Sequence, residues 1–278
     1  MIRIDTHHHL WQYKAADYGW INQQMGMLRR NFTTVDLKAE MVCGAVDFTV
    51  AVQASQTLND TRFLLNAARD FPAIKGVVGW VPLVDQDVEM DLEHFAADPK
   101  LRGVRHVLHD EADDNYMLRA DFNRGIRILA QFNLTYDILI FERHLPQTIE
   151  FVDKHPAQRF VVDHLAKPRV RDDVLSPWCE RMFELAKRSN VYCKLSGLVT
   201  EADHASWTRA QVSKYMDVVL NAFGPQRVMF GSDWPVCLLA ISYAEWAAVV
   251  SDEIAELSED EQAQIWSGTA VEAYQLSL

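Results

Sequence analysis

The sequence is poor in the features that mark secreted, membrane-bound and nucleic-acid-binding proteins. Only four of its 278 residues are cysteine, and they lie far apart without a C-x-x-C spacing, which argues against a disulfide framework or a zinc ribbon. The net charge is -12 and the chain contains no run of basic residues, so neither a nucleic acid nor an anionic membrane is an expected partner. No apolar stretch approaches the ~20 residues that span a bilayer, and no charged-then-apolar leader precedes the first apolar segment. We therefore expect a cytoplasmic protein that acts on a small molecule.

Linker-like Gly/Ser or Pro stretches, low-complexity tracts and internal repeats are also missing, so residues 1–278 are expected to form a single domain. The chain instead alternates short, apolar, β-branched segments with amphipathic ones that carry apolar residues at three- and four-residue intervals. The apolar segments are Ile2–Thr6, Phe48–Gln53, Ile74–Trp80, Gly103–Val107, Leu134–Ile138, Arg159–Asp163, Val191–Leu195 and Arg227–Gly231. The amphipathic segments include Thr61–Asp70, Ala120–Phe132, Pro146–Lys154, Pro177–Ser189 and Gln211–Phe223. This pattern of a strand followed by a helix, repeated eight times, predicts an α/β fold, the (β/α)8 TIM barrel.

The first apolar segment runs into an Asp-x-His-x-His motif, Asp5, His7 and His9, whose counterpart is the distant Gly231-Ser232-Asp233-Trp234-Pro235. Side chains alternate faces along a strand, so His7 and His9 are predicted to point the same way. A remnant of a purification tag is the alternative, but a tag would not continue a strand and run on into Leu10 and Trp11. Two histidines and one distant aspartate outline a site that activates water.

The carboxyl ends of barrel strands converge on one mouth, so the last residues of each strand are expected to face one another. Almost every predicted strand ends in a polar or aromatic side chain. In chain order these are His7 and His9, Gln53, Trp80, Arg105 and His106, Tyr136, Asp163 and His164, Lys194, and Asp233. This enrichment is typical of a binding or catalytic site rather than a structural barrel end.

Asp233 is the natural general base of this set, because a carboxylate among imidazoles keeps a low pKa and can take a proton from water. The alternative is that Asp233 caps the helix after Trp234-Pro235, and that His164 is a hydrogen-bonded core histidine. Arg105 and Lys194 suit binding of a substrate oxygen or stabilisation of an oxyanion, or else pairing with acids such as Asp110 or Glu201. The tryptophans, Trp11, Trp20, Trp80 and Trp234, suit either the walls of a sugar site or the core.

Taken together, these segments resemble the amidohydrolase-related TIM-barrel hydrolases over essentially the whole chain. The resemblance is carried by Asp5–Trp11, Val52-Gln53-Ala54, Gly76–Val81, Gly103-Val104-Arg105, Asp163–Pro168, Lys194–Gly197 and Gly231–Pro235. Within that group the chain is most similar to the sugar lactonases, in particular the L-fuconolactone hydrolases, in Arg105–Glu111 and Leu134–Asp137.

The resemblance has consequences for metal binding. Other members of the superfamily hold one or two divalent ions with a lysine or glutamate on strand four and a histidine on strand five, where this chain has Arg105 and Tyr136. A binuclear centre is therefore not expected. His7, His9, His164 and Asp233 are an acceptable ligand set for one zinc or manganese ion. The resemblance to metal-independent lactonases implies instead that the four residues hold water directly, with no obligatory cofactor.

We thus expect a hydrolase that opens an aldonic-acid lactone, L-fucono-1,5-lactone or L-fucono-1,4-lactone. The catalytic residues would be Asp233, His7, His9 and His164, and the substrate-binding residues Gln53, Trp80, Arg105, Tyr136, Lys194 and Trp234. One rival is a decarboxylase, or a hydrolase of a pyrone dicarboxylate or muconolactone, whose substrates call for several arginines. Another is a sugar-acid-binding barrel without catalysis. The apolar segment Tyr243–Val250 suits a homo-oligomer interface as well as internal packing.

Overall fold

Eight parallel strands form one sheet in sequence order, and the predicted (β/α)8 barrel is confirmed. The computed structural model describes all 278 residues. Its strands are β1 (Ile4–His8), β2 (Phe48–Val52), β3 (Ile74–Gly79), β4 (Leu101–Val107), β5 (Thr135–Leu139), β6 (Phe160–Val162), β7 (Val191–Leu195) and β8 (Val228–Phe230). The prediction for the first strand was displaced by two residues, because pairing with β2 begins only at Ile4 and Ile2 is exposed.

The barrel closes where β1 meets the end of β8. His9 donates its backbone N–H to the carbonyl of Trp234 at 2.7 Å, and Asp233 donates its N–H to the carbonyl of His7 at 2.7 Å. Between these strands lies the buried carboxylate of Asp5, which accepts hydrogen bonds from the N–H of Ser232 (2.8 Å) and its Oγ (2.7 Å). The seam is therefore closed mainly by residues of the two motifs.

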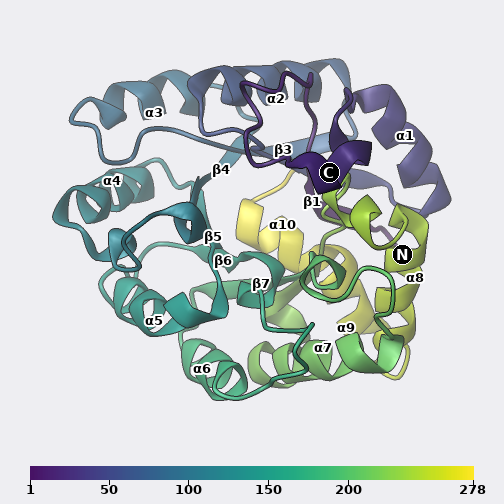
Figure 1. Cartoon of the computed structure of the whole chain (residues 1–278). Helices are drawn as coiled ribbons and strands as arrows, with labels where there is room; N and C mark the ends of the chain where they lie inside the picture. The colour runs from purple at the N-terminus through teal and green to yellow at the C-terminus, as the bar shows by residue number, and fades with distance from the viewer.

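Helices surround the sheet as an outer ring (Figure 1). They are α1 (Thr34–Cys43), α2 (Leu58–Asp70), α3 (Val88–Ala96), α4 (Ala120–Gln131), α5 (Leu145–Asp153), α6 (Trp178–Leu185), α7 (Arg209–Phe223), α8 (Tyr243–Glu253) and α9 (Glu259–Ala263). Several helices have a hydroxyl side chain that caps the first turn. Thr33 precedes α1 and Ser242 precedes α8, and each belongs to a capping box. None of the helices combines the length and apolar character needed to span a bilayer.

The last helix, α10 (Thr269–Tyr274), departs from the simple alternation. It lies across the middle of the barrel in Figure 1, under the amino-terminal ends of the strands. Thr135 at the start of β5 donates its hydroxyl to the carbonyl of Ala273 at 2.5 Å, and Tyr192 of β7 donates to Glu272 Oε1 at 2.7 Å. The helix thus plugs the floor of the barrel, opposite the predicted site.

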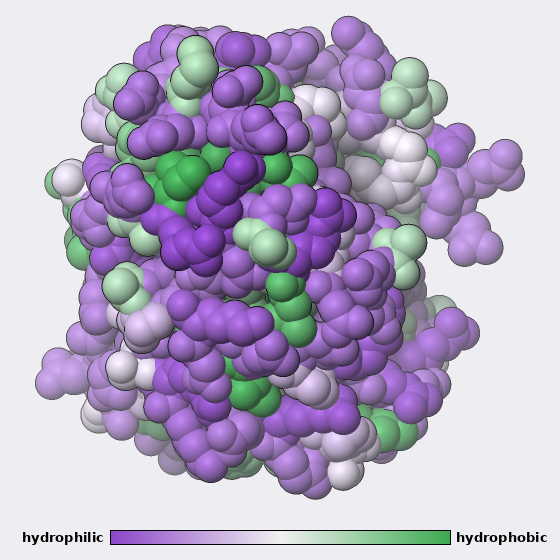
Figure 2. Space-filling view, turned by 90° about the vertical axis from the view of Figure 1, so that its left-hand side faces the viewer, coloured by the Kyte–Doolittle hydropathy of each residue, from purple (hydrophilic) through white to green (hydrophobic).

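The core has two parts. The larger fills the space between strands and helices, and it includes the buried face of α8, with Tyr243, Trp246 and Val250. The smaller fills the barrel floor, where Ile4, Val50, Val161 and Met229 meet Tyr274. The Tyr243–Val250 face is therefore internal packing within one chain. The outside is mainly hydrophilic on the face in Figure 2, with apolar residues in small groups, as the net charge of -12 leads one to expect.

Candidate active site

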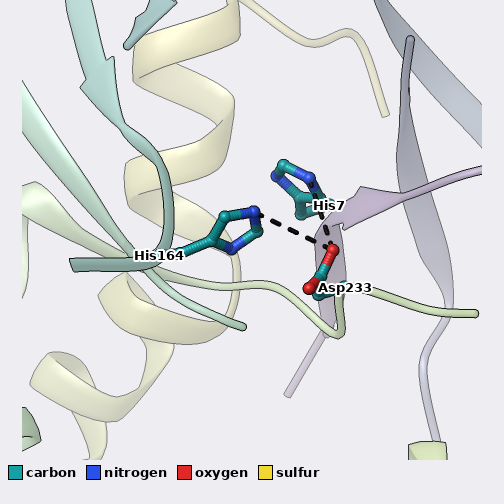
Figure 3. A group of neighbouring side chains, drawn as sticks. All are labelled: His7, His164 and Asp233. Carbon is teal, nitrogen blue, oxygen red and sulfur yellow. Dashed lines mark ion pairs between the residues drawn. The ribbon is translucent and has the colours of Figure 1, made fainter. Parts of the chain in front are cut away.

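Three imidazoles converge on one carboxylate at the carboxyl ends of the strands. Oδ1 of Asp233 lies 3.4 Å from Nε2 of His9 and 3.8 Å from Nε2 of both His7 and His164. All four side chains are buried, with His9 the most exposed at 5%. Figure 3 shows His7 from β1 and His164 from the turn after β6, both facing the same carboxylate oxygen of Asp233. The structure therefore brings together the four residues that sequence analysis named as catalytic.

The rings are held by their other nitrogen atoms. Nδ1 of His9 lies 2.8 Å from the carbonyl oxygen of Val52, and its Nε2 lies 3.4 Å from Oδ1 of Asp233 and 3.2 Å from Nε2 of His7. Nδ1 of His164 lies 2.8 Å from Oγ of Ser196. Asp233 makes no capping bond to the turn that follows it, since the residues 236–239 have no side-chain cap. Its carboxylate is thus free to serve the histidines.

The electrostatics keep the imidazoles of His7 and His164 neutral and the carboxylate of Asp233 ionised at neutral pH. Burial lowers the pKa of His164 to about 4, against the opposing effect of Asp233, and burial likewise lowers the pKa of His7 well below its usual value. Burial alone would raise the pKa of Asp233, but its interactions with His164 and His9 leave that pKa below the usual value. A base that is ionised next to neutral imidazoles is suited to accept a proton from water.

The backbone at this site is strained. Four consecutive residues, His164, Leu165, Ala166 and Lys167, have φ between 47° and 59°, and Asp233 has φ of 57°. Left-handed backbone costs non-glycine residues roughly 1–2 kcal/mol each. Gly197 has φ of 59° and packs so closely that a Cβ there would lie 2.5 Å from Nδ1 of His164. Strain of this kind persists where surrounding contacts hold it, and it is typical of functional sites.

Below the histidines lies a buried set of charges. Nζ of Lys194 contacts Oδ2 of Asp137 at 2.6 Å, Oδ1 of Asp163 at 3.0 Å and Nδ1 of His7 at 3.1 Å. Its side chain is fully enclosed. Lys194 is therefore placed under His7 rather than on the surface of the site. Its partners are Asp137 and Asp163, not the Asp110 or Glu201 considered from the sequence.

Arg105 is the second buried cation. Its NH1 donates to Asp163 Oδ2 at 3.0 Å and lies 3.2 Å from Nε2 of His7. Its Nε and NH2 donate to Gln53 Oε1 at 3.1 and 2.6 Å, which fixes the guanidinium in one plane. The cations Lys194 and Arg105, together with His7, hold the pKa of Asp163 well below its usual range, although burial opposes them. The amide nitrogen of Gln53 remains buried without a hydrogen-bond partner.

Trp80 and Trp234 lie next to the cluster in different ways. The indole N–H of Trp80 points to Nδ1 of His106 at 3.4 Å, and His106 stacks on Tyr116 with centroids 5.1 Å apart. This group forms an aromatic wall beside the mouth, and Glu111 fixes it through Nε2 of His106 at 2.7 Å. Trp234 is fully buried at the barrel seam and packs edge-on against Phe32.

Tyr136, like the enclosed Lys194 and the buried Trp234, is a predicted substrate-binding residue that the structure does not place at the surface of the site. Its ring packs between the sheet and the helices, against Phe122 of α4 and Phe151 of α5. Strand alternation then turns its neighbour Asp137 toward the barrel interior, where it meets Lys194. Sequence analysis missed Asp137, and the signal was available: a lysine in an apolar strand needs a buried carboxylate partner.

The loop after β1 covers one side of the mouth. Trp11 packs edge-on against Trp20 and Phe32, and the indole N–H of Trp20 donates to the carbonyl of Ala54 at 3.0 Å. A hollow of about 410 Å³ opens between this loop and the start of α2. Its lining is largely polar and includes Tyr18, Ser55, Thr57, Asn59 and Asp60.

The site has ligands for one metal ion but not for two. His7, His164 and Asp233 offer ligand atoms within 4.8 Å of one another, and two nitrogens with a carboxylate oxygen are a zinc-type set. The position under His7, where a second ion would need ligands, is taken by the ammonium of Lys194. Strand β4 supplies Arg105 there, which adds positive charge instead of a ligand.

The chain belongs to the amidohydrolase family, because the family model described as "Amidohydrolase" matches residues 4–276. It is 44% identical to an L-fucono-1,5-lactonase of Burkholderia multivorans, over 99% of this chain and 96% of that protein. Two crystal structures of an amidohydrolase from Burkholderia multivorans cover both chains fully. The one with bound HEPES has a TM-score of 0.96 at 42% identity, and the one with bound zinc has 0.94 at 43%. The resemblance predicted from the motifs is thereby confirmed.

Proposed function

We propose that this protein is a lactonase that hydrolyses a sugar lactone, L-fucono-1,5-lactone, to the open sugar acid. The observation that carries the proposal is the convergence of three Nε2 atoms on Oδ1 of Asp233. The similarity to an L-fucono-1,5-lactonase supports this substrate over the 1,4-lactone, which we keep as the second compound to test.

The chemistry follows from the geometry. Asp233 takes a proton from a water held among His7, His9 and His164, and the hydroxide attacks the lactone carbonyl carbon. Electrons move to the carbonyl oxygen, which becomes an oxyanion. When the carbonyl re-forms, the bond to the ring oxygen breaks, and that oxygen leaves as a hydroxyl with the proton that Asp233 had taken. The product carboxylic acid then releases one proton to solvent at neutral pH.

Arg105 is the better placed of the two cations to stabilise the oxyanion. Its NH1 lies beside the imidazole of His7, whereas Lys194 is enclosed by Asp137, Asp163 and His7. A preorganised cation in a buried site needs no reorganisation when charge develops. Gln53 has an unpaired amide N–H₂ group that suits a substrate hydroxyl, and the Trp80 and Trp20 rings suit the apolar face of the sugar.

The metal is proposed to be dispensable. A lactone carbonyl is more electrophilic than an amide, and the three histidines with Asp233 form a set that can hold a water directly. If zinc or manganese binds, His7, His164 and Asp233 would hold it, with His9 as the fourth ligand expected from the sequence, and the ion would supply Lewis acidity.

The site also argues against a substrate with several carboxylates. Arg105 is a single cation that is already shared with Gln53 and Asp163, and Lys167 at the mouth is paired with Glu201 at 2.7 Å. No cation cluster is left to bind a pyrone dicarboxylate, so a less charged lactone is favoured.

The test is the initial rate of acid release from a panel of sugar lactones, measured with a pH indicator. The protein is first stripped with a chelator and assayed for residual metal. Activity on L-fucono-1,5-lactone without metal is expected, whereas activity that returns only with zinc or manganese would make the four residues ligands. No activity on any lactone would refute the proposal and leave a decarboxylase or a non-catalytic binding barrel.

Asp233→Asn tests the base. It should lower kcat by about 10³-fold, within the range for general-base catalysis. Asp60→Asn is the matched control, because Asp60 is also a buried carboxylate near the mouth but accepts only backbone N–H groups of Ala54 and Ser55. A D233N protein that kept most of its activity would remove Asp233 as the base.

A further inference from the structure

The buried charges under His7 continue through the barrel to its floor. The hydroxyl of Tyr274, in α10, donates to the carboxylate of Asp137, with distances of 2.8 Å to Oδ2 and 3.0 Å to Oδ1. Asp137 contacts Nζ of Lys194 at 2.6 Å, and Lys194 contacts Nδ1 of His7 at 3.1 Å. All four residues are 0% exposed. An unbroken polar chain therefore connects the C-terminal helix with a histidine of the site.

Each member of this chain depends on the one below it. A buried ammonium is stable only against well-placed carboxylates, and Lys194 has two, Asp137 and Asp163. Asp163 is shared with Arg105 and His7, but Asp137 has no partner other than Lys194 and Tyr274. Without the Tyr274 hydroxyl, Asp137 would be held by the flexible end of one lysine alone.

We propose that Tyr274 is a positioning residue for the reaction, which acts on His7 through Asp137 and Lys194. Its hydroxyl fixes the Asp137 carboxylate, the carboxylate fixes the ammonium, and the ammonium fixes the edge of the His7 ring that faces away from Asp233. Groups that hydrogen-bond the second nitrogen of a metal-ligating histidine commonly alter metal affinity or activity 10–100-fold when removed, and we expect an effect at the lower end of this range for His7. The floor of the barrel thus sets the geometry at its mouth.

The same helix offers a matched control. Tyr192 of β7 donates to Glu272 Oε1 at 2.7 Å, two residues before Tyr274 and in the same layer of the barrel floor. Glu272 makes no contact with Asp137, Lys194 or His7. Tyr192→Phe therefore removes the same kind of bond, from the same helix, without touching the polar chain.

The experiment measures kcat and KM on L-fucono-1,5-lactone, together with thermal unfolding, for the full-length protein and its variants. Tyr274→Phe should lower kcat about tenfold and leave KM within about twofold, because His7 orients the attacking water rather than the sugar. Tyr192→Phe should leave both constants at the wild-type value. Both variants should have a lower unfolding temperature than the wild type. Only the change in kcat therefore distinguishes a residue that positions His7 from one that supports the fold alone.

Asp137→Asn keeps a partner for the Tyr274 hydroxyl but removes the charge that faces Lys194, and it should also lower kcat. If Tyr274 acts through Asp137, the double variant Y274F/D137N should be no slower than D137N alone. Wild-type kcat in Y274F, an equal loss of kcat in Y192F, or additive losses in the double variant would each overturn the inference. Should Y274F fail to fold, full activity of D137N would overturn it too.

This inference rests on the proposed function, but the two fail differently. Wild-type protein that hydrolyses no lactone refutes the proposed function itself. Wild-type protein that is active, with Y274F equally active, refutes only the positioning role of Tyr274.

Discussion

Replacement of Asp5 by Asn should change how stability depends on pH. Asp5 is fully buried, and its two oxygens accept hydrogen bonds from the N–H of His7, from Ser232 and from the hydroxyl of Tyr243. Burial outweighs these bonds and raises the pKa of Asp5 from 3.8 to about 6. The folded protein therefore keeps this proton over a pH window in which the unfolded chain has already lost it.

The sign and size of the effect follow from linkage. Because the folded-state pKa is the higher one, the free energy of unfolding falls as pH rises from 3.8 to about 6 and is level above that window. Each pKa unit corresponds to about 1.4 kcal/mol, so the ionisation of Asp5 costs about 3 kcal/mol at neutral pH. Asn has nearly the same shape and no charge, so D5N should lack this part of the slope.

Urea unfolding of both proteins, at a series of pH values between about 4 and about 8, measures the difference. Relative to wild type, D5N should gain up to about 3 kcal/mol of stability across the window. Asp60, whose pKa burial also raises to about 6, should give a similar slope difference in D60N. Parallel curves for wild type and both variants would refute the reasoning.

Three further outcomes test the site. Tyr136→Phe should leave kcat and KM within about twofold and change the free energy of unfolding by no more than about 1 kcal/mol, because the buried hydroxyl makes no hydrogen bond of ordinary geometry. A large rise in KM would instead place Tyr136 in the substrate site. Gly197→Ala should lower kcat by roughly 10–100-fold, since its Cβ would lie 2.5 Å from Nδ1 of His164; normal kinetics would show that His164 need not hold its position. The pKa of Asp233 lies below its usual value, so kcat/KM should stay level down to about pH 5, whereas an acid limb near the usual histidine pKa of about 6.5 would make an imidazole the base.

The barrel, and the proximity of His7, His164 and Asp233, could be predicted from the sequence because both depend on local pattern plus one fold-level rule. Apolar segments of the right length and spacing fixed the order of the strands, and convergence of the strand ends then brought His7, His164 and Asp233 together. These are features that any chain with this alternation must share.

The parts that were not predicted depend on which face of a strand points inward. Period-two alternation says that Tyr136 and Asp137 face opposite ways, but it does not say which one faces the barrel interior. The deciding fact is the buried charge of Lys194, which attracts Asp137, and that contact lies two strands away. The contact of Tyr274 with Asp137 could not be predicted for a further reason. Nothing in the repeating pattern indicates that the last helix lies under the barrel.

The seam between β1 and β8 has a consequence for the synthesis and folding of the protein. Asp5 and Ser232, the residues that close it, are 227 positions apart, and Asp233, His7 and His9 flank the same seam. A ribosome must therefore deliver nearly the entire polypeptide before Asp233 can meet His7 and His9. Turnover of lactone during refolding would accordingly report only molecules in which the first strand has joined the eighth, and it would not detect structure that forms before that contact.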